Sequence, residues 1–168
     1  MNDGCKNIDV PLTRRHRQRG FSLLEVLVAL LVLSIGLLGL AALQTMGLKF
    51  NTQSYQRTQA VLNAYDIIDR IRANPAGMAT GGYDNIGLTA AAPTPPTCPC
   101  TPAQMATYDV AQWKASLTQL LTQGKGAVCR GTLDTSWTCT VTGGTNFQVG
   151  IEWTENDLPM RMVVEAQL

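Results

Sequence analysis

Glu25 is the carboxylate whose surroundings are most unusual, because an uncharged apolar run follows it directly. Residues 26–43 form a stretch of 18 residues without a charged side chain. A run of this length is about the minimum that crosses a bilayer as a helix. A charge inside a membrane segment costs about 2.5–3.5 kcal/mol on insertion scales and normally has a partner. Glu25 therefore either lies hydrated at the membrane interface or neutralises a positive group close to it.

Cysteines offer a second kind of chemistry. Cys5 lies near the N-terminus, and the other four are Cys98, Cys100, Cys129 and Cys139. An even number of cysteines in an exported domain indicates disulfides, and the pairing is open. The C-x-C spacing would strain a bridge between Cys98 and Cys100, so we expect each of them to pair with a cysteine further along the chain. Zinc sites prefer C-x₂₋₄-C pairs, which these spacings fit poorly, so we expect no metal.

Residues 21–168 lack the groups that common enzyme sites need. The single histidine of the chain, His16, precedes them. Catalysis by a Ser-His or Cys-His pair is therefore excluded in this part of the chain, and so is a histidine-ligated metal. The sequence also contains no P-loop and no G-x-S-x-G motif. We expect a protein that is not an enzyme and that needs no cofactor.

Charge is distributed unevenly along the chain. Residues 1–20 contain five Lys or Arg against two Asp, net +3, whereas residues 21–168 contain eight Lys or Arg against ten Asp or Glu, net −2. Basic residues beside a membrane segment tend to stay in the cytoplasm, so the C-terminal part is expected in the periplasm. Because no basic patch lies in residues 21–168, we expect no nucleic-acid partner.

Residues 20–25 read GFSLLE, and the apolar run follows them. This arrangement resembles the prepilin motif of type IV pilins and of type II secretion pseudopilins. The resemblance implies that a prepilin peptidase cuts between Gly20 and Phe21 and methylates the new N-terminus, which gives N-methyl-Phe21. It also implies that Glu25 helps subunits to enter the filament. The ammonium of Phe21 would lie four residues before Glu25, so the two charges can pair within one helix or between subunits.

Helical patterning continues beyond the apolar run. Residues 44–73 contain no proline, and an apolar stripe repeats at helical spacing. The stripe consists of Val61, Ala64, Tyr65, Ile68 and Ile71. We expect one helix over residues 21–73, which Asn74, Pro75 and Gly77 end.

The segment that follows is expected to be irregular at first. Residues 78–102 are rich in Gly, Ala, Thr and Pro, which predicts a loop. A short amphipathic helix is predicted over residues 109–123, capped by Asp109 or Thr107 and ended by Gly124.

The last part of the chain reads as β-structure. Period-2 alternation predicts strands over residues 137–141, 147–153 and 160–166 and an edge strand over residues 128–133. We expect Trp113, Trp137 and Trp153 to lie in the core. The fold class is therefore α+β: a long N-terminal helix packs against an antiparallel sheet, which resembles the type IV pilin fold.

The same reasoning divides the chain into four parts. Residues 1–20 are expected to be a cleaved leader, and residues 21–43 a transmembrane and filament-core helix. Residues 44–75 would form the soluble half of the long helix, and residues 76–168 a globular head. The location implied is a single pass through the inner membrane with the head in the periplasm, followed by the pilus at the cell surface.

Residues 64–75 read AYDIIDRIRANP and look like a segment of the PilV family of minor pilins. The resemblance implies a minor pilin that primes assembly of type IV pili, is incorporated into them and supports twitching motility. Its partners would be the prepilin peptidase, other minor pilins, the major pilin and the inner-membrane assembly platform. One alternative is a type II secretion pseudopilin of the I type. Another is a pilus-tip adhesion module that contacts a surface ligand through the 78–102 loop.

Overall fold

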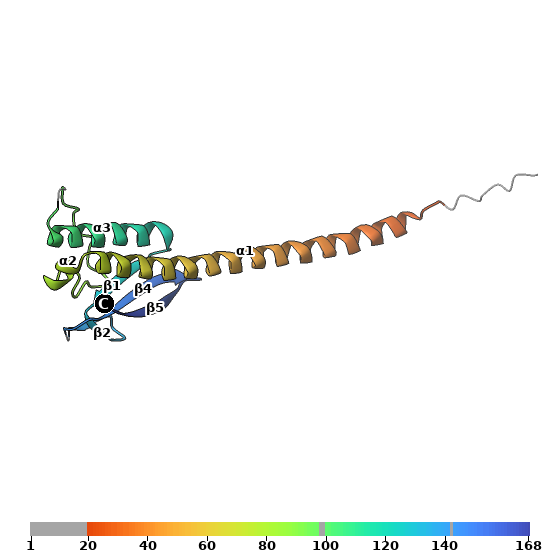
Figure 1. Ribbon diagram of the computed structural model, residues 1–168. Helices are drawn as coiled ribbons and strands as arrows, with labels where there is room; N and C mark the ends of the chain where they lie inside the picture. The colour runs from red at the N-terminus through yellow and green to blue at the C-terminus, as the bar shows by residue number, and fades with distance from the viewer. Residues whose placement is uncertain (1–19, 98–99, 142) are drawn as a thin grey trace, which may run out of the picture. The chain divides into compact units, whose positions relative to one another are not determined.

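The structure, a computed structural model, describes residues 20–97, 100–141 and 143–168. Its internal contacts divide the chain into two compact units, Met1–Met46 and Gly47–Leu168. The elements (Figure 1) are α1 (Leu23–Ala73), α2 (Pro75–Ala79), α3 (Pro102–Leu120), β1 (Lys125–Cys129), β2 (Gly131–Leu133), β3 (Cys139–Val141), β4 (Asn146–Glu155) and β5 (Leu158–Gln167).

Helix α1 confirms the expected N-terminal helix and has 51 residues. It begins where the carbonyl of Ser22 accepts the amide of Glu25 at 3.0 Å. It ends before Asn74, whose backbone has φ −124° and ψ 65°. The residue before a proline is pushed out of the helical region, so Pro75 sets this end.

One face of the C-terminal half of α1 packs against α3 and the sheet. Its buried side chains are Ala60, Asn63, Ala64, Ile67, Ile68 and Ile71. The predicted stripe was wrong at Val61 and Tyr65, which are 39% and 51% exposed. Each of these two residues follows a buried alanine, so its side chain lies about 100° further round the helix and beyond the packed face.

A short helix, α2, follows α1 where the sequence analysis expected only a stop. The side-chain oxygen of Asn74 accepts the amide of Gly77 at 3.0 Å. Pro75 occupies the first turn, where its missing N–H leaves no hydrogen bond unmade. Asn74 therefore both follows the end of α1 and caps α2, and the loop begins only after Ala79.

Helix α3 starts at Pro102, well before the predicted residue 109. A capping box sets this start: Thr101 Oγ1 accepts the amide of Gln104 at 3.3 Å, and Gln104 Oε1 accepts the amide of Thr101 at 2.9 Å. Asp109 and Thr107 were wrong predictions for the cap, because both lie inside the helix.

The main sheet has three antiparallel strands in the order β1-β4-β5. Strands β4 and β5 confirm the predictions over 147–153 and 160–166 and form a hairpin. Its turn residues, Asn156 and Asp157, have φ values of 53° and 63°, as a two-residue hairpin turn requires. The predicted strand over 128–133 was wrong as a single strand, because the chain leaves β1 at Arg130 and forms β2, which pairs with β3 in a second sheet.

The core lies where α1, α3 and the inner face of β4 meet. Trp113 and Trp153 are buried in it, and the indole N–H of Trp113 donates to the carbonyl of Asn63 at 2.9 Å. Trp137 was wrongly expected there. It lies in the turn between β2 and β3 with φ 63°, and its ring takes the place of a side chain at Gly150 on the outer face of the sheet.

One disulfide joins Cys129, the last residue of β1, to Cys139, the first residue of β3, with 5.4 Å between their Cα atoms. The expectation that Cys98 and Cys100 pair with these later cysteines was therefore wrong. The physical reason is that the chain turns back after β1, which brings β3 against β1. Cys100 is also in a disulfide, and Cys98 lies outside the described residues.

Candidate processing and assembly site

The peptide bond between Gly20 and Phe21 lies in irregular chain just before α1. The ring of Phe21 is 83% exposed, and no atom lies within 4 Å of the place where a Cβ would stand on Gly20. Both properties leave this peptide bond accessible to another protein. Because glycine has no side chain, another chain can approach this backbone closely.

Phe21 and Glu25 lie on one side of the beginning of α1. Together with Val26, Ala29, Leu30 and Leu33, they line a shallow hollow of about 330 Å³ along the helix. Glu25 is in the first turn, where unpaired backbone N–H groups favour a negative charge. The spacing of four residues predicted that Phe21 and Glu25 would share a side, and both line this hollow.

The first turns of α1 are apolar and entirely uncovered. The most apolar 18-residue window has a mean hydropathy of 2.8, and none of it is buried. By length and composition, α1 is the one helix in the described part of the chain that is apolar enough to span a membrane. At Gly36 and Gly39 no side chain covers the backbone, so another helix could approach closely there.

An apolar line also continues along the C-terminal half of α1. Leu48, Tyr55 and Leu62 follow one another at intervals of seven residues and are 68%, 55% and 56% exposed. Such a repeat places the side chains along one seam of a helix. They lie off the face that packs on α3 and the sheet, so this seam is free for a partner. Sequence analysis missed it because the buried stripe dominated the pattern.

A buried polar cluster fixes the chain that follows α2. Tyr83 donates its hydroxyl hydrogen to Asp109 at 2.6 Å and accepts a hydrogen bond from Asn74 at 3.1 Å. Arg70 of α1 contacts Asp109 at 3.4 Å and Asp66 at 2.9 Å. Burial and the bond to Asp109 raise the pKa of the Tyr83 phenol. The cluster therefore ties α1, the 80–97 loop and α3 together.

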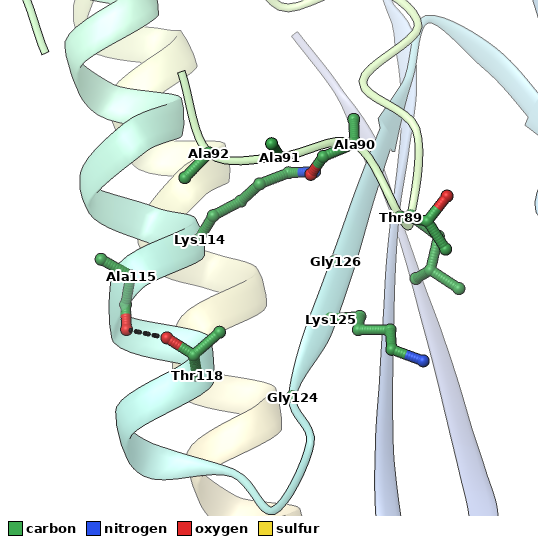
Figure 2. Close-up of a pocket in the computed structure, with 11 residues that line it drawn as sticks. Thr89, Ala90, Ala91, Ala92, Lys114, Ala115, Thr118, Gly124, Lys125 and Gly126 are labelled. Carbon is green, nitrogen blue, oxygen red and sulfur yellow. Dashed lines mark hydrogen bonds between the residues drawn. The ribbon is translucent and has the colours of Figure 1, made fainter. Parts of the chain in front are cut away.

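Lys114 is a second buried tie to the same loop. It is 7% exposed, and its ammonium donates to the carbonyls of Gly87 and Ala90 at 2.8 and 2.6 Å. Burial lowers the pKa of Lys114. Figure 2 shows its side chain reaching from α3 to the loop, beside a hollow of about 450 Å³ that is lined mainly by small residues of the loop, α3 and β1.

No cofactor site emerges from these contacts. Among residues 20–97, 100–141 and 143–168, no group of three or more His, Cys, Asp or Glu side chains is placed to hold a metal ion. The polar clusters instead bind one part of the chain to another. What the described chain offers for function is an accessible segment before α1 and two uncovered apolar surfaces on α1.

Two family models match the chain. Residues 15–41 match the prokaryotic N-terminal methylation motif, and residues 42–111 match the family described as type IV pilin Tt1218. No curated protein and no solved structure matches it. The apolar N-terminal helix and the motif fit a single-pass, membrane-anchored pilin. The chain thus carries a prokaryotic N-terminal methylation motif followed by a type IV pilin family segment, on a long helix packed against an antiparallel sheet.

Proposed function

We propose that the chain is a minor pilin that primes assembly of type IV pili and is incorporated into them, so that it supports twitching motility. The observation that carries the proposal is the order of features at the start of α1. An accessible Gly20–Phe21 bond and Glu25 directly precede an apolar helix face that the chain itself leaves uncovered. The methylation-motif match over residues 15–41 supports the same order.

In this proposal residues 1–20 are a leader, and a prepilin peptidase cuts after Gly20 and methylates Phe21. Residues 21–43 cross the inner membrane and later pack in the filament core. Residues 44–75 continue the helix, and residues 76–168 form a head in the periplasm. Cleavage creates an ammonium one helical turn before Glu25, and pairing removes the cost of an isolated charge in lipid.

The proposal also names partners. Other minor pilins and the major pilin would pack along α1, where the membrane stretch and the seam of Leu48, Tyr55 and Leu62 are both exposed. Burying a leucine side chain fully is worth about 1.5–3 kcal/mol, so each of these positions can contribute substantially to subunit packing. The inner-membrane assembly platform would receive the subunit before it enters the pilus.

A direct test of processing uses Gly20→Val in the full chain. The branched side chain should block cleavage, so the chain keeps residues 1–20. Mass spectrometry of the wild-type N-terminus should give N-methyl-Phe21. Ser22→Ala, two residues away, is a matched control that should be processed normally. A wild-type chain isolated with an N-terminus other than Phe21 would contradict this site.

The role in assembly is tested by deleting the gene and scoring sheared surface pili and secreted proteins. Complementation with Glu25→Ala should fail to restore pili. Complementation with Asp69→Ala, which removes an exposed carboxylate elsewhere on α1, should succeed. Normal pili with stalled protein secretion would favour the pseudopilin of the I type.

The adhesion alternative is tested by replacing the exposed part of the loop, residues 91–95, with a Gly-Ser segment of equal length. These residues lie after the contacts that Lys114 makes with the loop. Lost adhesion with normal pili would favour the adhesion module. Lost pili would assign the loop to assembly.

A further inference from the structure

Strand β5 forms one edge of the three-stranded sheet, and its outer side is open. Glu155 and Leu158 flank the two-residue turn, so every second residue from Leu158 onwards bonds to β4. The residues that alternate with these, among them Arg161, Val163 and Glu165, direct their backbone N–H and C=O groups away from β4. Within the described residues, no hydrogen bond reaches these outward groups. We call this row the β5 edge.

The apolar side chains along β5 are covered only in part by the chain itself. Val163, on the outer face, is 49% exposed. On the inner face, Met160, Met162 and Val164 pack against the core but are only partly buried. An open strand with incompletely covered apolar side chains is a template for pairing with another strand. Pro159 has no N–H, so it limits such pairing at the start of the strand.

The charges along the β5 edge are self-complementary. Arg161 is positive, Val163 is apolar and Glu165 is negative, and all three side chains are on the outer face. Arg161 already donates to Glu152 of its own chain at 3.2 Å and to the carbonyl of Thr135 at 2.5 Å, but its side chain stays 48% exposed and within reach of a second carboxylate. In an antiparallel pair of two such strands centred on Val163, each arginine faces the glutamate of the other copy. Shifting the centre by one residue places a charge opposite Val163 instead. Opposite charges facing across strands are favourable, so this register is preferred over its neighbours.

We propose that a second copy of this chain pairs antiparallel with the β5 edge, about a two-fold axis at Val163. The two valines exchange both main-chain hydrogen bonds, and each Arg161 exchanges both with the facing Glu165. The pair joins two three-stranded sheets into one continuous sheet and extends the apolar layer formed by Met162 and Val164. Such a contact is isologous, because the same surface serves both copies.

The two-fold axis also sets the directions of the helices that pack on the two sheets. A two-fold axis between antiparallel edge strands is normal to the sheet, so it reverses every direction in the plane of the sheet. The turns of α1 that pack on the sheet therefore run in opposite directions in the two copies. The contact involves residues 47–168 alone, and the proposal does not depend on the proposed function.

Site-specific cross-linking of the full chain in detergent tests the register. In a Cys5→Ser background, Val163→Cys places two thiols opposite each other, about 5.5 Å apart between Cα atoms, within the range of a disulfide. Mild oxidation should give a disulfide-linked dimer. Glu165→Cys is the matched control, because the two thiols it introduces lie several residues apart in this register and should not cross-link. Equal cross-linking of both variants, or none with Val163→Cys, would overturn the proposal.

Two further changes in the Val163→Cys chain test the charges. Glu165→Lys places like charges opposite each other and should lower the yield of cross-linked dimer about tenfold. Asp69→Lys makes the same charge change on α1 and should leave the yield unchanged. If the two variants behave alike, the charge register is wrong.

A third variant, Val163→Pro in the Cys5→Ser chain, removes an outward N–H while leaving the bonds to β4 in place, as Pro159 already does four residues earlier. Sedimentation in detergent should then show less dimer than the Cys5→Ser parent. Thermal unfolding checks that the sheet is intact. A folded Val163→Pro chain that dimerises like the parent would overturn the proposal.

Discussion

The two halves of α1 belong to one continuous helix, but the chain itself buries side chains of only one of them. Residues 23–46 are exposed on every side, and none of their apolar side chains is buried. Residues 60–71 present a buried face of small and β-branched side chains to α3 and β4. The backbone geometry is the same in both halves. What differs is which molecule supplies the covering surface.

This difference teaches that the helical pattern alone does not tell how a helix is stabilised. Short isolated helices are marginal in water, and most helical stability in proteins comes from packing. The C-terminal half of α1 receives this packing from the same chain. The N-terminal half has to receive it from lipid or from another subunit, and in lipid every backbone hydrogen bond must be made within the helix.

The sharpest test of the contrast is to remove the same kind of bulk from each half. Ile67 is fully buried, so Ile67→Ala should lower the free energy of unfolding by about 2–5 kcal/mol. Leu31 is 56% exposed, so Leu31→Ala should leave it within about 0.5 kcal/mol. Urea unfolding of the full chain in detergent, followed by the near-ultraviolet signal of the buried tryptophans, measures both. Equal effects would show that the N-terminal half also depends on packing for the stability of the chain.

A somewhat smaller loss of stability is expected when the disulfide is removed. Replacing both Cys129 and Cys139 by alanine should cost about 2–3 kcal/mol, because the bond closes only a short loop. The turn between them keeps a second attachment, since the indole N–H of Trp137 donates to Glu152 at 3.1 Å. Thermal unfolding of the double variant checks the size of the loss. Unchanged stability would mean that the tryptophan and its neighbours hold the turn alone.

The sequence was sufficient to predict the parts with a strong, uninterrupted pattern. The long helix and the β4–β5 hairpin each have a period that extends over many residues, and both were confirmed. Glu25 and Gly20 were singled out by the resemblance of residues 20–25 to the prepilin motif, whose residues are neighbours in sequence. Local patterns therefore predicted the helix and the hairpin, and the resemblance indicated the fold class and the segment proposed for processing.

Features that depend on which surfaces meet could not be predicted in this way. Asp109 has the composition of a helix cap, but in the structure it accepts a hydrogen bond from Tyr83, far from it in sequence. Trp137 alternates with its neighbours like a strand residue, yet it fills the space above Gly150 in an outer turn. Thr101 and Gln104 form a capping box that could have been found, but Thr101 lay in the segment assigned to a loop, and no helix was expected before residue 109.

The buried phenol of Tyr83 offers a pH test of the attachment between α1 and the 80–97 loop. The folded chain raises the pKa of this phenol above its ordinary value of 10.0, so the folded state keeps the proton longer than the unfolded state. Its contribution to stability is therefore complete below about pH 10 and is lost as the pH rises above that value. Tyr83→Phe should cost about 1–2 kcal/mol at neutral pH and flatten this alkaline loss.

Unfolding at pH 7–11 measures the change, with Tyr65→Phe as the control, because Tyr65 is 51% exposed. The quantity to compare is the difference in free energy of unfolding between Tyr83→Phe and the wild type at each pH. Burial lowers the pKa of Lys114, so its contribution to stability rises as the pH approaches the ordinary lysine value of 10.5. If Tyr83→Phe lost stability at alkaline pH as steeply as the wild type, the loss would come from other titratable groups.

The smallest effect is expected at a hydrogen bond between α1 and the turn that joins α3 to β1. The side-chain amide of Gln56 donates to Thr122 Oγ1 at 2.7 Å in an exposed position. An exposed hydrogen bond exchanges protein for water, so Gln56→Ala should change the free energy of unfolding by about 0.5 kcal/mol at most. Hydrogen exchange of the α1 amides near residue 56 is the more sensitive measurement, and faster exchange confined to those turns is expected. If exchange instead became faster along the whole buried half, this contact would help to hold all of that half in place, and its turns would open cooperatively.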